Sequence, residues 1–316
     1  MGRLAELVLQ LRVWVAKQRR ARTFIAIAAI FALVLPSPAA ADQPVDLELV
    51  LAVDVSRSID ADETALQRAG YSEAIRHPDF LRAIKAGYHG RIAISYFEWA
   101  GNVRQDSIVS WRIIDSEESA AAFADRIGGG AADRIGDDPI DRLEALARQL
   151  GSDNFARRLG RDPSGGLRGT SISSALTFAT GFIAAAPFAE ERRVIDVSGD
   201  GPNNAGSPVL EARAAALSAG IVINGLPLLI RPSPTYKQLD RYYADCVIGG
   251  PGSFMLPVYD MSEFATAIRR KLILEVGGAQ PPARIMPAAD SEPTDCLRGE
   301  FDRRLFSDPF FPELDK

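Results

Sequence analysis

The chain of 316 residues is 47% hydrophobic and 24% charged, which excludes a disordered or fibrous protein. Its length fits one large domain or two small ones. The formal net charge is −5, and without the first 41 residues, which hold six Lys/Arg and one acid, 30 basic and 40 acidic residues remain, a net of −10. Because such an acidic protein repels phosphate backbones, we expect no nucleic acid among its partners.

The N-terminal segment has the pattern of a secretory signal peptide. A basic cluster runs from Lys17 to Arg22, an apolar run follows at residues 23–35, and small residues precede Asp42. The apolar run of about 13 residues is shorter than the roughly 20 that span a membrane. We therefore predict a signal peptide at 1–41, export to the periplasm or the medium, and no stable membrane span after cleavage. An uncleaved N-terminal anchor is the alternative.

Beyond this segment, strand-like apolar runs alternate with helical stretches. The first half has expected strands at 47–54, 91–99 and 103–114, the last two close enough to form a hairpin, and expected helices at 61–75, 80–86, 116–127 and 140–150. The second half has expected helices at 170–185, 208–219 and 262–276, and expected strands at 193–198, 220–228 and 253–258.

This alternation predicts an α/β fold with a doubly wound, mostly parallel sheet and helices on both faces. We assign the domain to residues 42–276 and a tail rich in Pro and charge, with little core of its own, to residues 277–316. In open α/β sheets, ligands bind beyond the carboxyl ends of the strands. The chemistry is therefore expected where strands end.

Three segments carry oxygen-bearing side chains at such positions. Asp54, Ser56 and Ser58 follow the first strand, Thr170 opens a helix, and Asp200 follows the strand at 193–198. Oxygen ligands suit hard cations, so we predict a divalent cation, Mg²⁺ first, with Mn²⁺ and Ca²⁺ as alternatives. A zinc site of the His/Cys type does not fit a chain with only two His and two Cys in no cluster. Helix capping is the plainer interpretation of the same Ser, Thr and Asp residues.

At these residues the sequence resembles the von Willebrand factor A domain and its metal-ion-dependent adhesion site. The matching pattern is D-x-S-x-S at Asp54, Ser56 and Ser58, then Thr170, then Asp200, and the resemblance covers about residues 45–276. The segments 97–99 and 246–252 are similar to those of an uncharacterised group of bacterial exported proteins within this superfamily.

The resemblance implies a doubly wound fold and metal-bridged protein recognition. It places Ser56, Ser58 and Thr170 in direct contact with Mg²⁺ or Mn²⁺, and Asp54 and Asp200 in contact directly or through water. One position departs from the pattern, because Gly199 precedes Asp200 where the family usually has Thr or Ser. This puts the placement of the Asp200 carboxylate in doubt.

Three further residues are candidates for a partner-contact rim beside the cation. Glu98 and Trp99 end the second expected strand, and Asn203 follows Asp200. An aromatic residue there could anchor a partner. The alternatives are a Trp packed under a loop and an Asn that only makes a turn.

Cys246 and Cys296 are the only cysteines, and the sequence leaves open whether they form a disulfide in an oxidising compartment or stay separate thiols.

The functional prediction is a non-enzymatic module in which the cation bridges to an acidic group of another protein. No nucleophile-and-base pair is evident, and no G-x-S-x-G elbow occurs. One alternative is a metal-dependent hydrolase of phosphoesters or peptides, in which the cation activates water. Another is a structural envelope protein with a relic metal motif. The sequence identifies neither the partner nor the oligomeric state.

Overall fold

The computed structural model describes residues 43–56, 61–128, 169–230, 236, 238–260, 263–278 and 294–301. The predicted signal peptide, Ser58 and the helix expected at 140–150 lie outside these residues.

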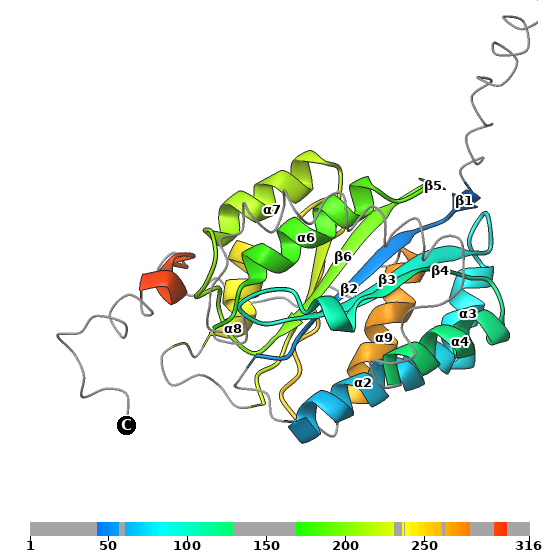
Figure 1. Ribbon diagram of the computed structural model, residues 1–316, viewed down its shortest axis with the longest axis horizontal. Coiled ribbons are helices and arrows are strands. Elements are labelled where there is room, and N and C mark those ends of the chain that lie inside the picture. Colours follow the sequence, from blue (N-terminus) through cyan, green and yellow to red (C-terminus); the bar gives the residue numbers. More distant parts are fainter. Residues whose placement is uncertain are drawn as a thin grey trace, which may run out of the picture. The chain divides into compact units, whose positions relative to one another are not determined.

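The described chain is built around a five-stranded sheet with strand order β4-β3-β2-β6-β7 (Figure 1). The strands are β2 (Glu48–Asp54), β3 (Ile92–Trp99), β4 (Val109–Ile114), β6 (Arg193–Gly199) and β7 (Val222–Pro227). All neighbours are parallel except β3 and β4, which pair antiparallel. The predicted class, a doubly wound and mostly parallel α/β sheet, is confirmed.

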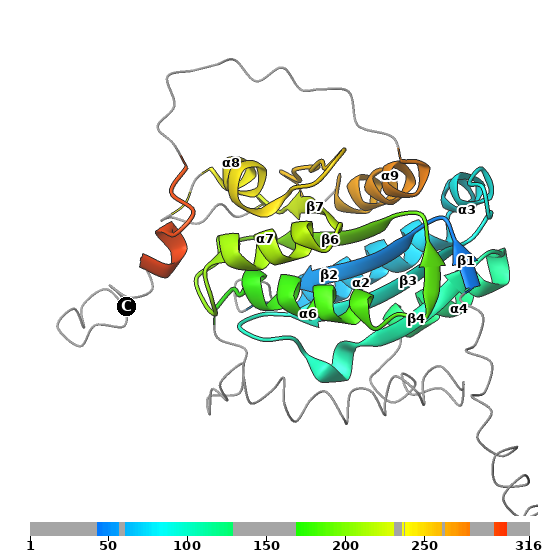
Figure 2. The same ribbon diagram turned by 90° about the horizontal axis from the view of Figure 1, so that it is seen from above.

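Alternation along the central strand divides the core into two layers. Leu49, Leu51 and Val53 face one side of the sheet, and Val50 and Ala52 face the other. The first side is covered by α2 (Ala61–Arg76), α3 (Pro78–Lys85), α4 (Glu117–Gly128) and α9 (Phe264–Gly277). The second is covered by α6 (Ile172–Ala184), α7 (Val209–Ser218), α8 (Leu239–Tyr242) and the π-helix η3 (Tyr243–Val247), as Figure 2 shows.

Local signals in the sequence set several helix ends. Ser171 caps α6 by accepting a hydrogen bond from Ser174 N, and Ser116 does the same for Ser119 N at the start of α4. Gly278 ends α9 in the left-handed conformation, with φ of 61°.

Several elements differ from the prediction. The strand expected at 253–258 is wrong, since this segment makes only isolated bridges, Met255 with Gly225 and Val258 with Leu228. Pro257 interrupts it, and proline cannot donate to a sheet ladder. The strand expected at 103–114 is shorter, because a 3-10 turn, η1 (Gln105–Ser107), precedes β4. The short parallel pair β1 (Gln43–Val45) and β5 (Phe188–Glu190) was not predicted, nor were α8 and η3.

The tail is attached to the domain at residues 294–301. A disulfide joins Cys246 of η3 to Cys296, with the two Cα atoms 5.6 Å apart. Asn203 Nδ2 also donates to Glu300 Oε1 at 2.7 Å. This part of the tail therefore packs beside the loop that follows β6. None of the described helices is both long enough and apolar enough to cross a membrane.

Candidate cation site

The structure brings together the three segments that the sequence singles out. Asp54 ends β2, and the adjacent parallel strand β6 ends at Gly199. A Cβ atom built on Gly199 would lie 2.9 Å from Asp54 Oδ2, and one on Gly201 would lie 3.6 Å from Thr170 Oγ1. The loop at residues 199–201 thus lies between Asp54 and Thr170.

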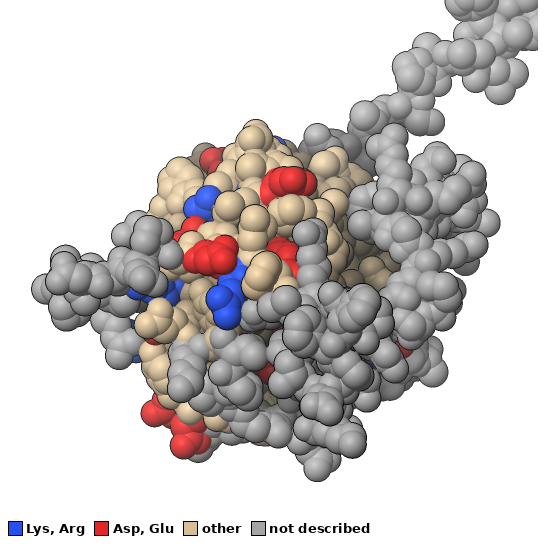
Figure 3. Space-filling model, turned by 90° about the vertical axis from the view of Figure 1, so that its left-hand side faces the viewer, with Lys and Arg blue, Asp and Glu red and all other residues tan. Residues whose placement is uncertain are grey.

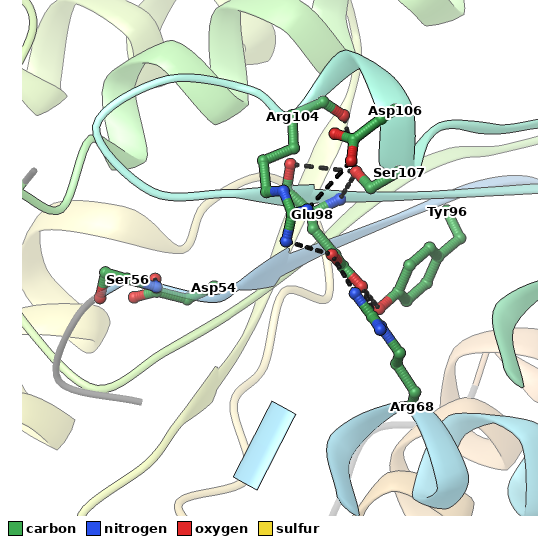
Figure 4. Close-up of polar contacts among 8 residues, drawn as sticks. All are labelled: Asp54, Ser56, Arg68, Tyr96, Glu98, Arg104, Asp106 and Ser107. Carbon is green, nitrogen blue, oxygen red and sulfur yellow. Dashed lines mark hydrogen bonds and ion pairs between the residues drawn. The ribbon is translucent and has the colours of Figure 1, made fainter. Parts of the chain in front are cut away.

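Asp54 is the centre of the site. Its side chain is 0% exposed, and Oδ1 accepts a hydrogen bond from Ser56 N at 2.7 Å (Figure 4). Among the described residues, Oδ2 is buried without a hydrogen bond of normal geometry. Burial raises the pKa of Asp54 well above its ordinary value and the charge of Asp200 raises it further, while hydrogen bonds from Ser56 and from the Asp200 backbone oppose the rise.

The loop before α6 holds Thr170 in place through its backbone. Thr170 N donates to Asn204 Oδ1 at 2.7 Å, and Thr170 O accepts from Asn204 N at 2.8 Å. The next residue, Ser171, donates its N–H to Ala100 O beyond β3 at 2.8 Å. These bonds fix the Thr170 loop between the end of β3 and the loop that follows β6.

The donor set fits a hard divalent cation. Asp54 and Asp200 provide carboxylates close enough to affect each other's ionisation, and Ser56 and Thr170 provide hydroxyls. No Lys or Arg of the described chain forms an ion pair with Asp54, although a buried carboxylate without a counter-charge is costly. A cation at Oδ2 would remove that cost. Within the described residues, no three His, Cys, Asp or Glu side chains group to hold a metal, so the site depends on hydroxyls.

The prediction that Glu98 and Trp99 form a partner-contact rim is wrong, because both side chains are buried. Glu98 and Trp99 are both 0% exposed. Glu98 accepts from Arg68 Nε at 2.5 Å, Arg68 Nη2 at 2.7 Å and Tyr96 Oη at 3.1 Å, and Arg104 Nη1 lies 3.3 Å away (Figure 4). Since Glu98 pairs with Val53 and Trp99 pairs with Asp54, Glu98 points to the sheet face opposite Asp54. The Trp99 side chain joins the apolar core on the Asp54 side.

Asn203 is also an interior residue, with an exposure of 0%. Its Oδ1 accepts from Ser173 N at 2.9 Å, and its Nδ2 donates to Ser207 O at 3.1 Å. Asn203 N donates to Tyr242 Oη at 3.1 Å. The residue therefore stabilises the loop after β6 from within rather than contacting a partner.

Tyr243 lies at the site although no sequence pattern indicated it. Its hydroxyl is 2.8 Å from the position of a Cβ atom on Gly199, next to Asp54 Oδ2. Burial raises the pKa of Tyr243 well above its ordinary value, and the charges of Asp54 and Asp200 add to the effect.

Figure 3 views the molecule from the end at which β2 and β6 terminate. On the described part of this face, acidic and basic side chains are interspersed. The described part of this face therefore does not form a uniformly acidic patch.

The mostly parallel sheet carries its oxygen donors at the carboxyl ends of β2 and β6, an arrangement that resembles the von Willebrand factor A domain. The chain belongs to the family described as "Protein of unknown function (DUF1194)", whose model matches residues 44–137 and 143–280. The prediction of an uncharacterised family is thereby confirmed. No curated protein sequence matches the chain.

Solved structures with the same kind of fold include three domains of different origin. A von Willebrand factor type A protein from Catenulispora acidiphila is 14% identical, with 74% of this chain and 43% of that chain covered and a TM-score of 0.46. Proximal thread matrix protein 1 from the mussel byssus, with a zinc-occupied MIDAS motif, is 13% identical over 74% and 48% of the chains, with a TM-score of 0.45. The vWF domain of the type V pili tip protein Mfa5 from Porphyromonas gingivalis is 10% identical over 76% and 98%, with a TM-score of 0.44.

These likenesses concern the fold alone. The chain spans less than half the length of the first two structures.

Proposed function

We propose that this chain is an exported, cation-dependent protein-binding module. Asp54, Ser56, Ser58, Thr170 and Asp200 hold one divalent cation, Mg²⁺ first, with Mn²⁺ and Ca²⁺ as alternatives. The cation supplies a positive charge that an acidic side chain of a partner protein can bind. The protein's own residues orient the ion and leave one side of it for that partner.

The observation that supports this proposal most directly is the state of the Asp54 carboxylate. One oxygen is fixed by Ser56 N, and the other is buried without a hydrogen bond of normal geometry among the described residues. Buried polar atoms nearly always have well-formed hydrogen bonds, so a buried carboxylate oxygen that lacks one beside a second acid favours a bound cation. With only two carboxylates, the ion keeps positive charge for an acidic partner.

The test is calorimetric titration of Mg²⁺ and Mn²⁺ into the metal-stripped full chain. We expect saturable binding, lost in Asp54→Asn. Asp46→Asn is a matched control, because Asp46 also accepts a backbone N–H, from His89 at 2.8 Å, but precedes β2 at the amino end of the sheet. Binding that survives in Asp54→Asn would overturn the assignment of Asp54, and no binding by the folded wild type would overturn the cation site.

The partner half of the proposal has its own test. The cation-loaded chain should retain an envelope protein that a chelator releases and that Asp54→Asn fails to retain. Exchange of the partner's contacting Asp or Glu for its amide should abolish retention. If the partner protein is retained in the presence of chelator and after the amide exchange, metal-bridged recognition is refuted.

A further inference from the structure

Tyr243 occupies a slot made by two glycines on neighbouring strands. A Cβ atom on Gly225 of β7 would lie 2.8 Å from Tyr243 Cδ1, and one on Gly199 of β6 would lie 2.8 Å from Tyr243 Oη. Side chains at these two positions would therefore collide with the ring and with the hydroxyl. The sheet has space for this tyrosine only because both positions are glycine.

The slot directs the phenol towards the candidate cation site. The same Cβ position on Gly199 lies 2.9 Å from Asp54 Oδ2, so the hydroxyl and the carboxylate oxygen flank one small space. Tyr243 is 0% exposed, and within the described chain its Oη has no hydrogen-bond partner. Two buried polar atoms that lack a hydrogen bond of normal geometry within the described chain thus adjoin the same space.

Such a pair is costly unless something occupies the space between the atoms. A buried hydroxyl without a hydrogen bond destabilises a fold, and a buried carboxylate oxygen without one destabilises it more. A nearby apolar ring edge would fill the slot equally well, so packing alone does not explain a tyrosine rather than a phenylalanine.

We propose that Tyr243 is a positioning residue of the cation site. Its hydroxyl hydrogen-bonds the oxygen cluster at Asp54 when the cation is bound, and it supplies the polar group that Gly199 cannot carry. This inference depends on the proposed cation site. It also accounts for the departure at Gly199, because the phenol from η3 takes the space of a side chain at that position.

The experiment compares Tyr243→Phe with Tyr71→Phe. Tyr71 is also a buried tyrosine, 1% exposed, whose Oη lacks a hydrogen bond of normal geometry among the described residues, but it belongs to the core on the opposite sheet face. Calorimetry with Mn²⁺ should show about tenfold weaker binding for Tyr243→Phe, the lower end of the loss seen when partners of metal ligands are removed. Tyr71→Phe should bind like the wild type.

A second readout separates positioning from packing. Addition of Mg²⁺ should perturb the near-ultraviolet absorption of tyrosine in the wild type and in Tyr71→Phe, but not in Tyr243→Phe. If the wild type binds the ion and Tyr243→Phe binds it equally well, or if Mg²⁺ still perturbs the tyrosine absorption of Tyr243→Phe, this inference fails and the proposed function stands. If the folded wild type binds no ion, both fail.

Gly225→Ala keeps the inference testable where Tyr243→Phe does not fold. The added methyl group would lie 2.8 Å from Tyr243 Cδ1 and would touch none of the proposed ligands, so it should displace the ring, weaken Mn²⁺ binding and reduce the tyrosine signal. Unaltered affinity and an unaltered signal in a folded Gly225→Ala protein would overturn the role of Tyr243.

Discussion

Lys271 Nζ lies 2.5 Å from Asp196 Oδ1 in the interior, and both side chains are 1% exposed. The same ammonium lies 2.5 Å from Glu275 Oε1, to which Asn224 Nδ2 donates at 3.2 Å. One cation thus faces two carboxylates and ties α9 to β6 and β7. Burial raises the pKa of Glu275 to about 7, with a further rise from the charge of Asp196 and an opposing effect from Lys271.

Lys271→Met should destabilise the fold strongly, because it leaves Asp196 and Glu275 buried without their counter-charge. We expect the free energy of unfolding to fall by about 3–5 kcal/mol at neutral pH, measured by urea denaturation. Lys85→Met, on the exposed side of α3, is the control and should change stability little. A loss in Lys271→Met no larger than in the control would contradict a structural role for this cluster.

Glu48 should make stability depend on pH. Burial raises its pKa from 4.5 to about 8, with a contribution from the charge of Glu190 and opposition from Arg193. Between these two pH values the folded state holds a proton that the unfolded state releases. The free energy of unfolding is therefore highest, as far as Glu48 is concerned, below pH 4.5, and it falls as pH rises towards about 8.

Glu48→Gln should remove this part of the pH profile. The variant should exceed the wild type in unfolding free energy by on the order of 3 kcal/mol above pH 8, which is less than the full pKa rise implies because solvent screens part of the charge, and the difference should shrink towards pH 5. Denaturation curves across that range provide the measurement, with the exposed Glu118→Gln as control. Parallel profiles for wild type and Glu48→Gln would refute the prediction.

The sequence predicted the sheet because its signals are local. The alternation of Leu49, Leu51 and Val53 with Val50 and Ala52 specifies a strand buried on both faces. Parallel strands then bring their carboxyl ends to one edge of the sheet, which is why residues 54 and 200 could be predicted from the sequence to lie together.

The rest of the site depends on contacts between distant segments. Glu98 was expected at the surface because it ends a strand, but its partner Arg68 belongs to a helix that precedes that strand. Tyr243 reaches the site through a π-helix that packs on Gly199 and Gly225. No periodicity or spacing in the sequence encodes either contact.

Glu98→Ala should lower the stability of the fold without changing cation binding. Removal of this carboxylate leaves Arg68 and Arg104 without their shared partner and creates a buried cavity. We expect a loss of about 3 kcal/mol in unfolding free energy. Calorimetric affinity for Mg²⁺ should be unchanged, because Glu98 and Asp54 point to opposite faces; a large loss of affinity in a folded variant would show that the two sites are coupled.

The disulfide should hold the tail against the domain. Cys246 and Cys296 are separated by 50 positions in sequence, and their bridge fixes residues 294–301 beside η3. Replacement of both by Ser should lower the unfolding free energy by about 2–4 kcal/mol. Reduction of the wild type should reproduce the change in thermal unfolding, and the double variant should be insensitive to reductant; equal stability of the oxidised and reduced protein would contradict the prediction.

Asp54 should lower stability in the absence of the ion and raise it in its presence. Without a cation its buried carboxylate lies beside the charge of Asp200, and one oxygen lacks a hydrogen bond of normal geometry among the described residues. Asp54→Asn should therefore stabilise the metal-free protein by about 1–3 kcal/mol. With Mg²⁺ at 100 times its dissociation constant, the wild type should gain about 2.7 kcal/mol, whereas the variant should gain nothing. Thermal unfolding with Mg²⁺ and with chelator measures both terms, with Asp46→Asn expected to respond to Mg²⁺ like the wild type. We therefore expect Asp54→Asn to be more stable than the wild type in chelator and to lose that advantage when Mg²⁺ is added. A variant that is less stable than the wild type under both conditions would mean that Asp54 stabilises the fold rather than binding the ion.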